Sequence, residues 1–288
     1  MISASISASA AAKINLFLHV NGKREDGYHL LESLVAFGDF ACDKITLKGA
    51  DSFSLKSTGP FAKDLPEDGG TNLISMAQSL LQNFTGRPIP CSITLEKNLP
   101  IGSGLGGGSS DAAIAVKLME NYFNLKITDD MRSNILVMLG ADVPICYHAK
   151  TSYFSGIGEV IDAAPRLPKT PILLIWPHIH CSTQDVFKRR DNVFTKPVTR
   201  PPSFNDFSSL VVFLKTTKND LETAAENIHP DIAMTRQWVS AQEGCLLSRM
   251  SGSGSTIFGI FEDEKSLQAA LSNVPPDKNW WASAGFLK

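Results

Sequence analysis

A run of glycines is the place in this sequence where residue types and spacing most clearly suggest chemistry. Five of the seven residues from Gly102 to Gly108 are glycine. Such density costs backbone entropy unless the chain needs positive φ angles or a very close approach by another group. Both needs arise where backbone N–H groups surround a phosphate at the N-terminus of a helix, and a helical pattern follows from Ser110. The expected phosphate-binding residues are Pro100, Gly102, Gly104, Leu105, Gly106, Gly107, Gly108, Ser109 and Ser110.

Two other glycine motifs compete with this interpretation. Gly102, Gly104 and Gly107 also match the dinucleotide-binding pattern GxGxxG, which should follow directly from a strand and lead to a second strand ending in an acid. Here Pro100 interrupts the approach, and the acids that begin at Asp129 open a helical pattern instead. A Walker loop is excluded because no lysine follows the last glycine.

A second glycine-rich turn, at 251–255, precedes an apolar strand pattern. It could be an ordinary tight turn, or it could close over a triphosphate, and the residues alone leave both interpretations open. The turn lacks the GxSxG arrangement of a nucleophile elbow, so a serine hydrolase is not favoured.

The elements that must position these loops are a mixture of strands and helices. Alternating or β-rich runs predict strands over 12–20, 43–47, 52–57 and 91–96, and helical patterns cover 72–83, 110–122 and 128–139. After a proline-rich stretch at 163–171, the patterns predict strands at 172–176 and 256–261 and helices near 221–227 and 231–242. The first ten residues are small and polar and are expected to fray. We predict an α+β protein with two domains, 1–165 and 166–288. Whether loops 59–71 and 188–205 act as lids stays open.

Composition excludes several classes of function. The chain has 288 residues, of which 43% are hydrophobic, and its 27 basic and 29 acidic side chains give a net charge of −2. Because these charges are interspersed and no basic face is visible, nucleic acid is not an expected partner. No apolar run is long enough for a membrane span, and the N-terminal residues do not resemble a secretory signal. We expect no membrane association.

The cysteines and histidines give no metal signature. Five cysteines form an odd set without a CxxC pair, which predicts reduced thiols and a cytoplasmic protein. The run from His178 to Cys181 holds three potential ligands, but no second ligand pair occurs at a suitable spacing, so we expect no structural zinc.

Three segments in order along the chain resemble the GHMP kinase superfamily. They are Ala-Lys-Ile-Asn-Leu at 12–16, the glycine loop at 100–113, and the second glycine turn at 250–258. The runs at 24–29, 105–111 and 140–144 resemble those members that act on an alcohol carrying a cytidine diphosphate group. The resemblance implies a two-domain fold, with an N-terminal ribosomal-protein-S5-domain-2-like domain and a C-terminal ferredoxin-like domain. It also implies transfer of the γ-phosphoryl group of ATP to an alcohol.

The resemblance assigns catalytic roles to Lys13 and Asp142. From the residues alone, Asp142 could equally be a capping or surface acid, and Lys13 could be a charge on an edge strand. The family match makes Asp142 the general base for the substrate hydroxyl, with Lys13 pairing with it to stabilise developing negative charge. Asn15 lies two residues beyond Lys13 on the same side of the predicted strand and could hold the alcohol or orient Asp142.

The resemblance also places substrate and nucleotide contacts. Tyr28 would stack on the cytosine, His29 would hydrogen-bond its polar edge, and Phe187 would form a second stacking wall; ordinary loop and core packing are the alternatives. Asn72 and Lys97 match positions near adenine and ribose, although Lys97 could also be a solvated charge at the end of a strand. Mg²⁺ is required with ATP, but no acidic ligand is marked, since Asp111 could be a first-turn acid of the helix. We expect a monomer or a weak homodimer.

Three rival functions remain at this point. A related kinase could act on homoserine or mevalonate, in which case Tyr28, His29 and Phe187 need not form a cytosine pocket. The GxGxxG match leaves a dinucleotide-dependent oxidoreductase open. A nucleotide-binding regulator without catalysis is the third, and the presence of both Lys13 and Asp142 counts against it.

Overall fold

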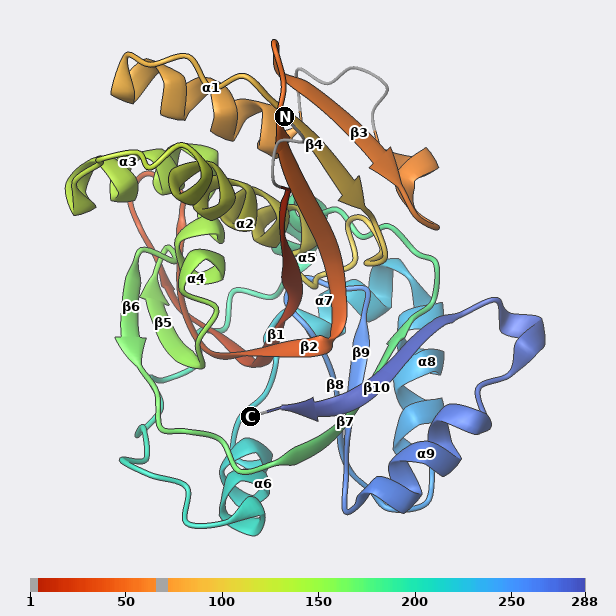
Figure 1. The fold of residues 1–288 in the computed structure, drawn as a ribbon. Helices are drawn as coiled ribbons and strands as arrows, with labels where there is room; N and C mark the ends of the chain where they lie inside the picture. The colour runs from red at the N-terminus through yellow and green to blue at the C-terminus, as the bar shows by residue number, and fades with distance from the viewer. Residues whose placement is uncertain (1–4, 66–71, 288) are drawn as a thin grey trace. The chain divides into compact units, whose positions relative to one another are not determined.

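The computed structural model describes residues 5–65 and 72–287. Figure 1 shows their helices and strands, coloured by position along the chain. These residues group into two compact units that are each discontinuous in sequence. Among the described residues, the first unit contains 5–12, 42–65, 72–101 and 106–149, and the second contains 13–41, 102–105 and 150–287. Because each unit is assembled from separate stretches of the chain, this grouping does not test the predicted boundary at 165, which stays a prediction.

The first unit joins a small sheet to four helices. The last residues of β2 (His29–Gly49) pair antiparallel with β4 (Cys91–Glu96), and β3 (Ser54–Thr58) pairs parallel with β4. The helices are α1 (Leu73–Thr85), α2 (Gly107–Tyr122), α3 (Asp129–Leu139) and α4 (Val143–His148), with a short 3₁₀ turn at Ala62–Asp64.

Local signals explain where two of these helices begin. The side chain of Asn72 accepts a hydrogen bond from the Ile74 amide at the start of α1, and Thr128 does the same for Met131 at the start of α3. Helix α1 ends at Gly86, which adopts a φ of 64°. The three predicted helices of this unit and the strand at 91–96 are confirmed.

The second unit contains a four-stranded sheet in the order β10-β7-β9-β8, with every neighbouring pair antiparallel. Its strands are β7 (Thr170–Trp176), β8 (Cys245–Met250), β9 (Ile257–Phe261) and β10 (Trp281–Leu287). Helix α8 (Pro230–Ser240) packs on β8 and β9, and α9 (Glu264–Ser272) packs on β7 and β10. Because β7 and β8 are separated by β9 in the sheet and joined through helices, this is the split βαβ arrangement of ferredoxin-like domains. The predicted α+β class is confirmed.

Further elements complete the second unit. The first part of β2 pairs with β5 (Ser152–Gly156), which pairs in turn with β6 (Val160–Ala163). The remaining elements are the later part of β1 (Ile6–Lys23), α5 (Thr183–Arg189), α6 (Phe207–Lys215), α7 (Glu222–Ile228) and a 3₁₀ turn at Pro276–Lys278.

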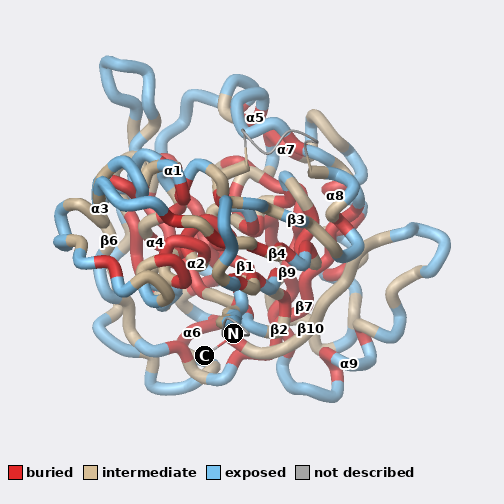
Figure 2. The backbone as a smooth tube through the Cα atoms, turned by 45° about the horizontal axis from the view of Figure 1, so that its top comes forward, coloured by how far each residue is buried: buried red, intermediate tan, exposed pale blue. Residues whose placement is uncertain are grey.

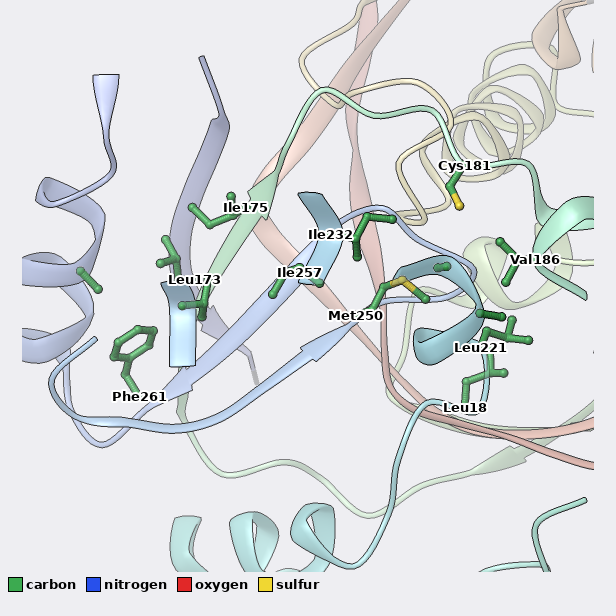
Figure 3. Packing of buried hydrophobic residues seen from close by; sticks show 14 of the residues in the cluster. Leu18, Leu173, Ile175, Cys181, Val186, Leu221, Ile232, Met250, Ile257 and Phe261 are labelled. Carbon is green, nitrogen blue, oxygen red and sulfur yellow. The ribbon is translucent and has the colours of Figure 1, made fainter. Parts of the chain in front are cut away.

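The core of the second unit explains why its central strand is a continuous apolar run in the sequence. All seven residues of β7 are buried, as Figure 2 shows in red. Leu173 and Ile175 of β7 pack in one cluster with Leu18 of β1, Met250 of β8 and Phe261 of β9 (Figure 3). A strand buried on both faces needs apolar side chains at every position, so it does not alternate.

The buried side chain of Arg249 ties β1 to the segment after α6. Its guanidinium donates to the carbonyl oxygens of Leu16 at 2.6 Å, Leu214 at 2.9 Å and Thr217 at 2.7 Å. Leu16 follows directly after Asn15, so these bonds hold in place the strand that carries two of the predicted site residues.

Two sequence predictions are corrected. Residues 1–10 were expected to fray, but Ile6–Ala10 begin β1, and the hydroxyls of Ser7 and Thr46 hydrogen-bond at 2.8 Å; residues 1–4 lie outside the described part. Small residues have little local preference for a strand, so here the pairing with a neighbouring strand keeps them ordered. The strand predicted at 43–47 starts much earlier, at His29.

The structure describes the two candidate lid loops, 59–71 and 188–205, to different extents. Part of the first, 66–71, lies outside the described residues. The second is held by bonds to β1 and β2: Thr195 donates its amide to the carbonyl of Val20, and Arg200 pairs with Glu32 at 3.0 Å. None of the helices in the described ranges is long and apolar enough to cross a membrane.

Candidate functional site

The N-terminus of α2 presents backbone amides that no side chain caps. Gly106 is the N-cap residue with a φ of 62°, and no side-chain capping bond or first-turn acid accompanies it. The first N–H groups of a helix have no partner within the helix, and the helix dipole makes this end attractive to anions. The hydroxyl of Ser110 donates to the carbonyl of Ala11 at 2.8 Å, so it serves neither as a cap nor as a free phosphate ligand in this structure.

The earlier part of the glycine loop lies against the second glycine turn within the second unit. The Thr256 amide donates to the Ser103 carbonyl at 3.0 Å, and the Ser251 hydroxyl donates to the Gly104 carbonyl at 3.1 Å. Gly104 has a φ of 81°, and a Cβ atom there would lie 2.5 Å from the Ser251 carbonyl oxygen and 2.8 Å from that of Gly254. The second turn is therefore more than an isolated turn before a strand, because it supports the Gly102–Leu105 backbone directly.

Lys97 is not the solvated charge that the sequence allowed. It is 2% exposed, and its Nζ lies 2.5 Å from Asp43 Oδ2 and 2.7 Å from Asp111 Oδ2. Asp43 is fully buried, and its other oxygen accepts from the amides of Asn98 at 2.6 Å and Leu99 at 2.8 Å. We call Lys97, Asp43 and Asp111 the buried ion cluster.

No pattern in the sequence indicates the buried ion cluster. Asp43 was expected only as the first residue of a strand, and Asp111 as an acid in the first turn of a helix. Asp111 instead lies beyond that turn and is buried. Burial raises the pKa of Asp111 to about 8, with the neighbouring carboxyl of Asp43 adding to the effect and the Lys97 ammonium opposing it. Burial lowers the pKa of Lys97, but the two carboxylates more than offset this and raise it overall.

Strand β1 carries Lys13 and Asn15, both buried in the second unit. The Lys13 amide donates to the Leu105 carbonyl at 2.8 Å, which ties the strand to the glycine loop. Asn15 donates its side-chain amide to the Ser33 hydroxyl at 2.9 Å, and its backbone amide donates to Ser251 Oγ at 3.1 Å. Its Oδ1 is buried and accepts no hydrogen bond from the described residues. A buried amide oxygen without a donor is costly, so it suits a ligand hydroxyl or another donor.

Asp142 belongs to the first unit and precedes α4. It occupies the N-cap position, but its carboxylate makes no capping hydrogen bond, so the capping interpretation is wrong. The residue is half-buried. Its pairing with Lys13 stays a prediction, because the two residues belong to different units.

Two of the three predicted cytosine contacts come together in the second unit. The rings of His29 and Phe187 stack with centroids 4.9 Å apart and an interplanar angle of 28°. Tyr28, 62% exposed, makes no ring contact with them among the contacts found in the described residues. Burial lowers the pKa of His29, and the positive charges of Arg190 and Lys23 lower it further. His29 is therefore neutral at neutral pH, with one nitrogen able to donate and the other able to accept.

The remaining nucleotide prediction, Asn72, is explained locally as the cap of α1, and its contact with a nucleotide stays untested. Within residues 5–65 and 72–287, no group of three or more His, Cys, Asp or Glu side chains could hold a metal ion. All five cysteines are free thiols.

Comparison with known proteins gives the family. The model of the GHMP kinases N-terminal domain matches residues 72–150, and that of the GHMP kinases C-terminal domain matches residues 206–278. A relative from Jannaschia sp. (strain CCS1) is 39% identical over 98% of this chain and 98% of its own length. One from Chelativorans sp. (strain BNC1) is 43% identical over 96% and 94%. The chain belongs to the GHMP kinase family.

The names of these relatives are more specific than the family. Both are called 4-diphosphocytidyl-2-C-methyl-D-erythritol kinase. A crystal structure of 4-(cytidine 5'-diphospho)-2C-methyl-D-erythritol kinase matches with a TM-score of 0.77 and 29% identity, covering 97% of this chain and 98% of that one. A homoserine kinase from Cytophaga hutchinsonii matches with a TM-score of 0.68, 15% identity and coverage of 99% and 94%, which shows the shared fold alone.

The close approach at Gly104 can be tested by stability. Gly104→Ala should lower the free energy of unfolding by at least about 3 kcal/mol, because it combines a strained φ with a clash against two carbonyl oxygens. The control is Gly86→Ala, where φ is also positive but no atom lies within 4 Å of the new Cβ, so the loss should be about 1 kcal/mol. Urea unfolding measures both, and equal losses would show that the carbonyl contacts do not constrain this position.

Proposed function

We propose that this chain transfers the γ-phosphoryl group of ATP to the 2-hydroxyl of 4-diphosphocytidyl-2-C-methyl-D-erythritol, a step of the non-mevalonate route to isoprenoid precursors. The proposal rests on the relatives of that name, which are 39% and 43% identical to this chain over at least 96% of its length. The uncapped start of α2 and the stacked His29–Phe187 pair support it, because they suit a polyphosphate and a flat heterocycle respectively.

The proposed reaction needs mainly positioning and neutralisation of charge. A new bond forms between the substrate oxygen and the γ-phosphorus, the bond from that phosphorus to the β,γ-bridging oxygen breaks, and ADP leaves. Asp142 accepts the proton of the alcohol, Lys13 stabilises the developing negative charge, and the free Oδ1 of Asn15 accepts a hydrogen bond that orients the alcohol. Mg²⁺ would be held by the phosphates of ATP and would supply neutralisation of their charge.

In the proposed substrate pocket, neutral His29 recognises cytosine by hydrogen bonding to its edge. A cytosine edge offers both an acceptor and a donor, and a neutral imidazole can complement both. Phe187 supplies a stacking wall, and the exposed Tyr28 would move onto the other face of the base when substrate binds. The amides of Gly106–Ser109 hold the phosphates of ATP, Asn72 lies nearer the adenosine, and Lys97 supports the first turn of α2 from behind. In this proposal the enzyme works as a monomer or a weak homodimer in the cytoplasm.

The direct test of substrate class is ADP release coupled to an NADH-linked assay. The substrates are 4-diphosphocytidyl-2-C-methyl-D-erythritol, mevalonate and homoserine, each with Mg-ATP. Turnover with the cytidyl alcohol and not with the others is the expected result. Turnover with mevalonate or homoserine alone would support kinase activity but contradict the proposed cytosine pocket. The absence of ADP release with all three substrates would contradict the proposed function.

Replacing the proposed base tests the chemistry separately from nucleotide binding. Asp142→Asn should lower kcat by about 10²–10⁴-fold, because the amide cannot accept the proton, while calorimetry should find ATP binding unchanged within about threefold. Asp51→Asn, which removes an exposed carboxylate of the same unit, should leave kcat unchanged. Full turnover by Asp142→Asn would remove this residue from the mechanism.

Neutral His29 predicts a pH dependence that is specific to the cytidyl substrate. Because its pKa lies below the ordinary value, KM for that substrate should be flat near neutrality and rise by up to about tenfold per pH unit once the imidazole is protonated. KM for ATP should not follow this rise. His29→Gln, which stays neutral, should abolish the acid limb; an unchanged acid limb in that variant would assign it to another group.

A further inference from the structure

The buried ion cluster lies directly against the first turn of α2. Gly107 is the first residue of that helix, and a Cβ atom there would lie 3.0 Å from Lys97 Nζ and 3.5 Å from Asp43 Oδ2. Asp111 belongs to the next turn of the same helix. Asp43, from β2, also holds the amides of Asn98 and Leu99, which lead into the glycine loop. Three elements of the first unit are thus tied together just behind the proposed phosphate site.

The charges of this cluster do not balance if every group is ionised. One ammonium faces two carboxylates, and all three side chains are buried, so the fully ionised cluster carries a net negative charge out of contact with water. The hydrogen bonds are also incomplete, because Asp111 Oδ1 is buried and accepts no bond from the described residues. A buried carboxylate oxygen without a donor is expensive, whereas a carboxylic acid needs fewer donors.

We propose that Asp43, Lys97 and Asp111 are positioning residues for the nucleotide, and that Asp111 carries a proton when ATP binds, so that the cluster behind Gly107 is neutral. The inference rests on the proposed ATP site at the start of α2. Loss of the proton leaves a negative charge behind amides that must face phosphate, and it weakens the cluster that fixes those amides. Lys97 and Asp43 are the charged groups that act most strongly on the carboxyl of Asp111.

The sign of the pH effect follows from the direction of the shift. Burial and the Asp43 carboxyl raise the pKa of Asp111 to about 8, so the neutral cluster exists below that pH and is lost above it. Affinity for ATP should therefore fall on the alkaline side, by up to about tenfold per pH unit above the pKa. The affinity for the cytidyl substrate should not follow the same curve.

The test is the pH profile of ATP binding, followed by calorimetry, in the parent chain and in Asp111→Asn. Asparagine keeps the shape and neutrality of the protonated acid but cannot lose a proton. We expect this variant to bind ATP within about threefold of the parent near neutral pH and to lack the alkaline fall. Glu96→Gln is the matched control, since it removes an exposed carboxylate beside Lys97, and it should keep the fall.

The outcomes separate this inference from the proposed function. If the parent binds ATP equally well across about pH 7–9.5, the proposed protonation of Asp111 is wrong, although the proposed kinase activity is not affected. The same conclusion follows if the alkaline fall in affinity persists in Asp111→Asn. Failure of the parent to bind ATP at any pH would instead contradict the proposed function. Infrared spectroscopy of the protein alone gives an independent readout: the carbonyl band of a buried carboxylic acid should be present near neutral pH, vanish at alkaline pH and be missing from Asp111→Asn. Absence of that band in the parent would also overturn the inference.

Discussion

Burying a lysine ammonium costs on the order of several kcal/mol unless opposite charges and hydrogen bonds replace its water shell. Lys97 is stabilised in this way by Asp43 and Asp111. Because the three residues come from different elements of the first unit, their pairing requires those elements to lie together. Removing Asp43 would leave the ammonium without an ionised partner when Asp111 carries a proton, so β2, the end of β4 and α2 are coupled through one small cluster. This coupling fixes the position of the amides at the start of α2.

In the second unit, hydrogen bonds to main-chain groups hold the glycine loop in position. The Gly102–Leu105 segment is held by the amides of Lys13 and Thr256 and by the Ser251 hydroxyl. The backbone amide of Asn15 also donates to Ser251, so one serine links the glycine loop to the strand that carries Lys13. Arg249 anchors the same strand from the other side through the carbonyl of Leu16. Each of these bonds uses a main-chain group, which explains why small residues recur where the two glycine segments meet.

Sequence reasoning succeeded where the cause was local. The glycine loop and the helix after it, the capped start of α3 and the apolar strand β7 were all predicted because turn chemistry, capping and burial leave direct patterns. The family likewise followed from ordered motifs, and the comparisons confirm it.

Sequence reasoning failed where partners are distant along the chain. The early part of β2 and all of β10 were missed, because each is ordered by pairing with a strand far away in sequence. The buried ion cluster joins residues up to 68 positions apart, and no single residue in it looks unusual on its own. Lys97 was expected near adenosine, yet its burial could be recognised only after Asp43 and Asp111 had been placed around it. The family resemblance assigned His29 and Phe187 to one cytosine pocket, and the structure brings the two rings together, but their stacking on each other was not predicted.

The proposed reaction moves a phosphoryl group to an alcohol, and this distinguishes it from simple hydrolysis of ATP. Phosphorus-31 NMR of a reaction with 4-diphosphocytidyl-2-C-methyl-D-erythritol tests it most directly. We expect a new phosphomonoester signal equal in amount to the ADP formed, with the diphosphate signals of the substrate retained. Inorganic phosphate equal to the ADP, with no phosphomonoester, would contradict it.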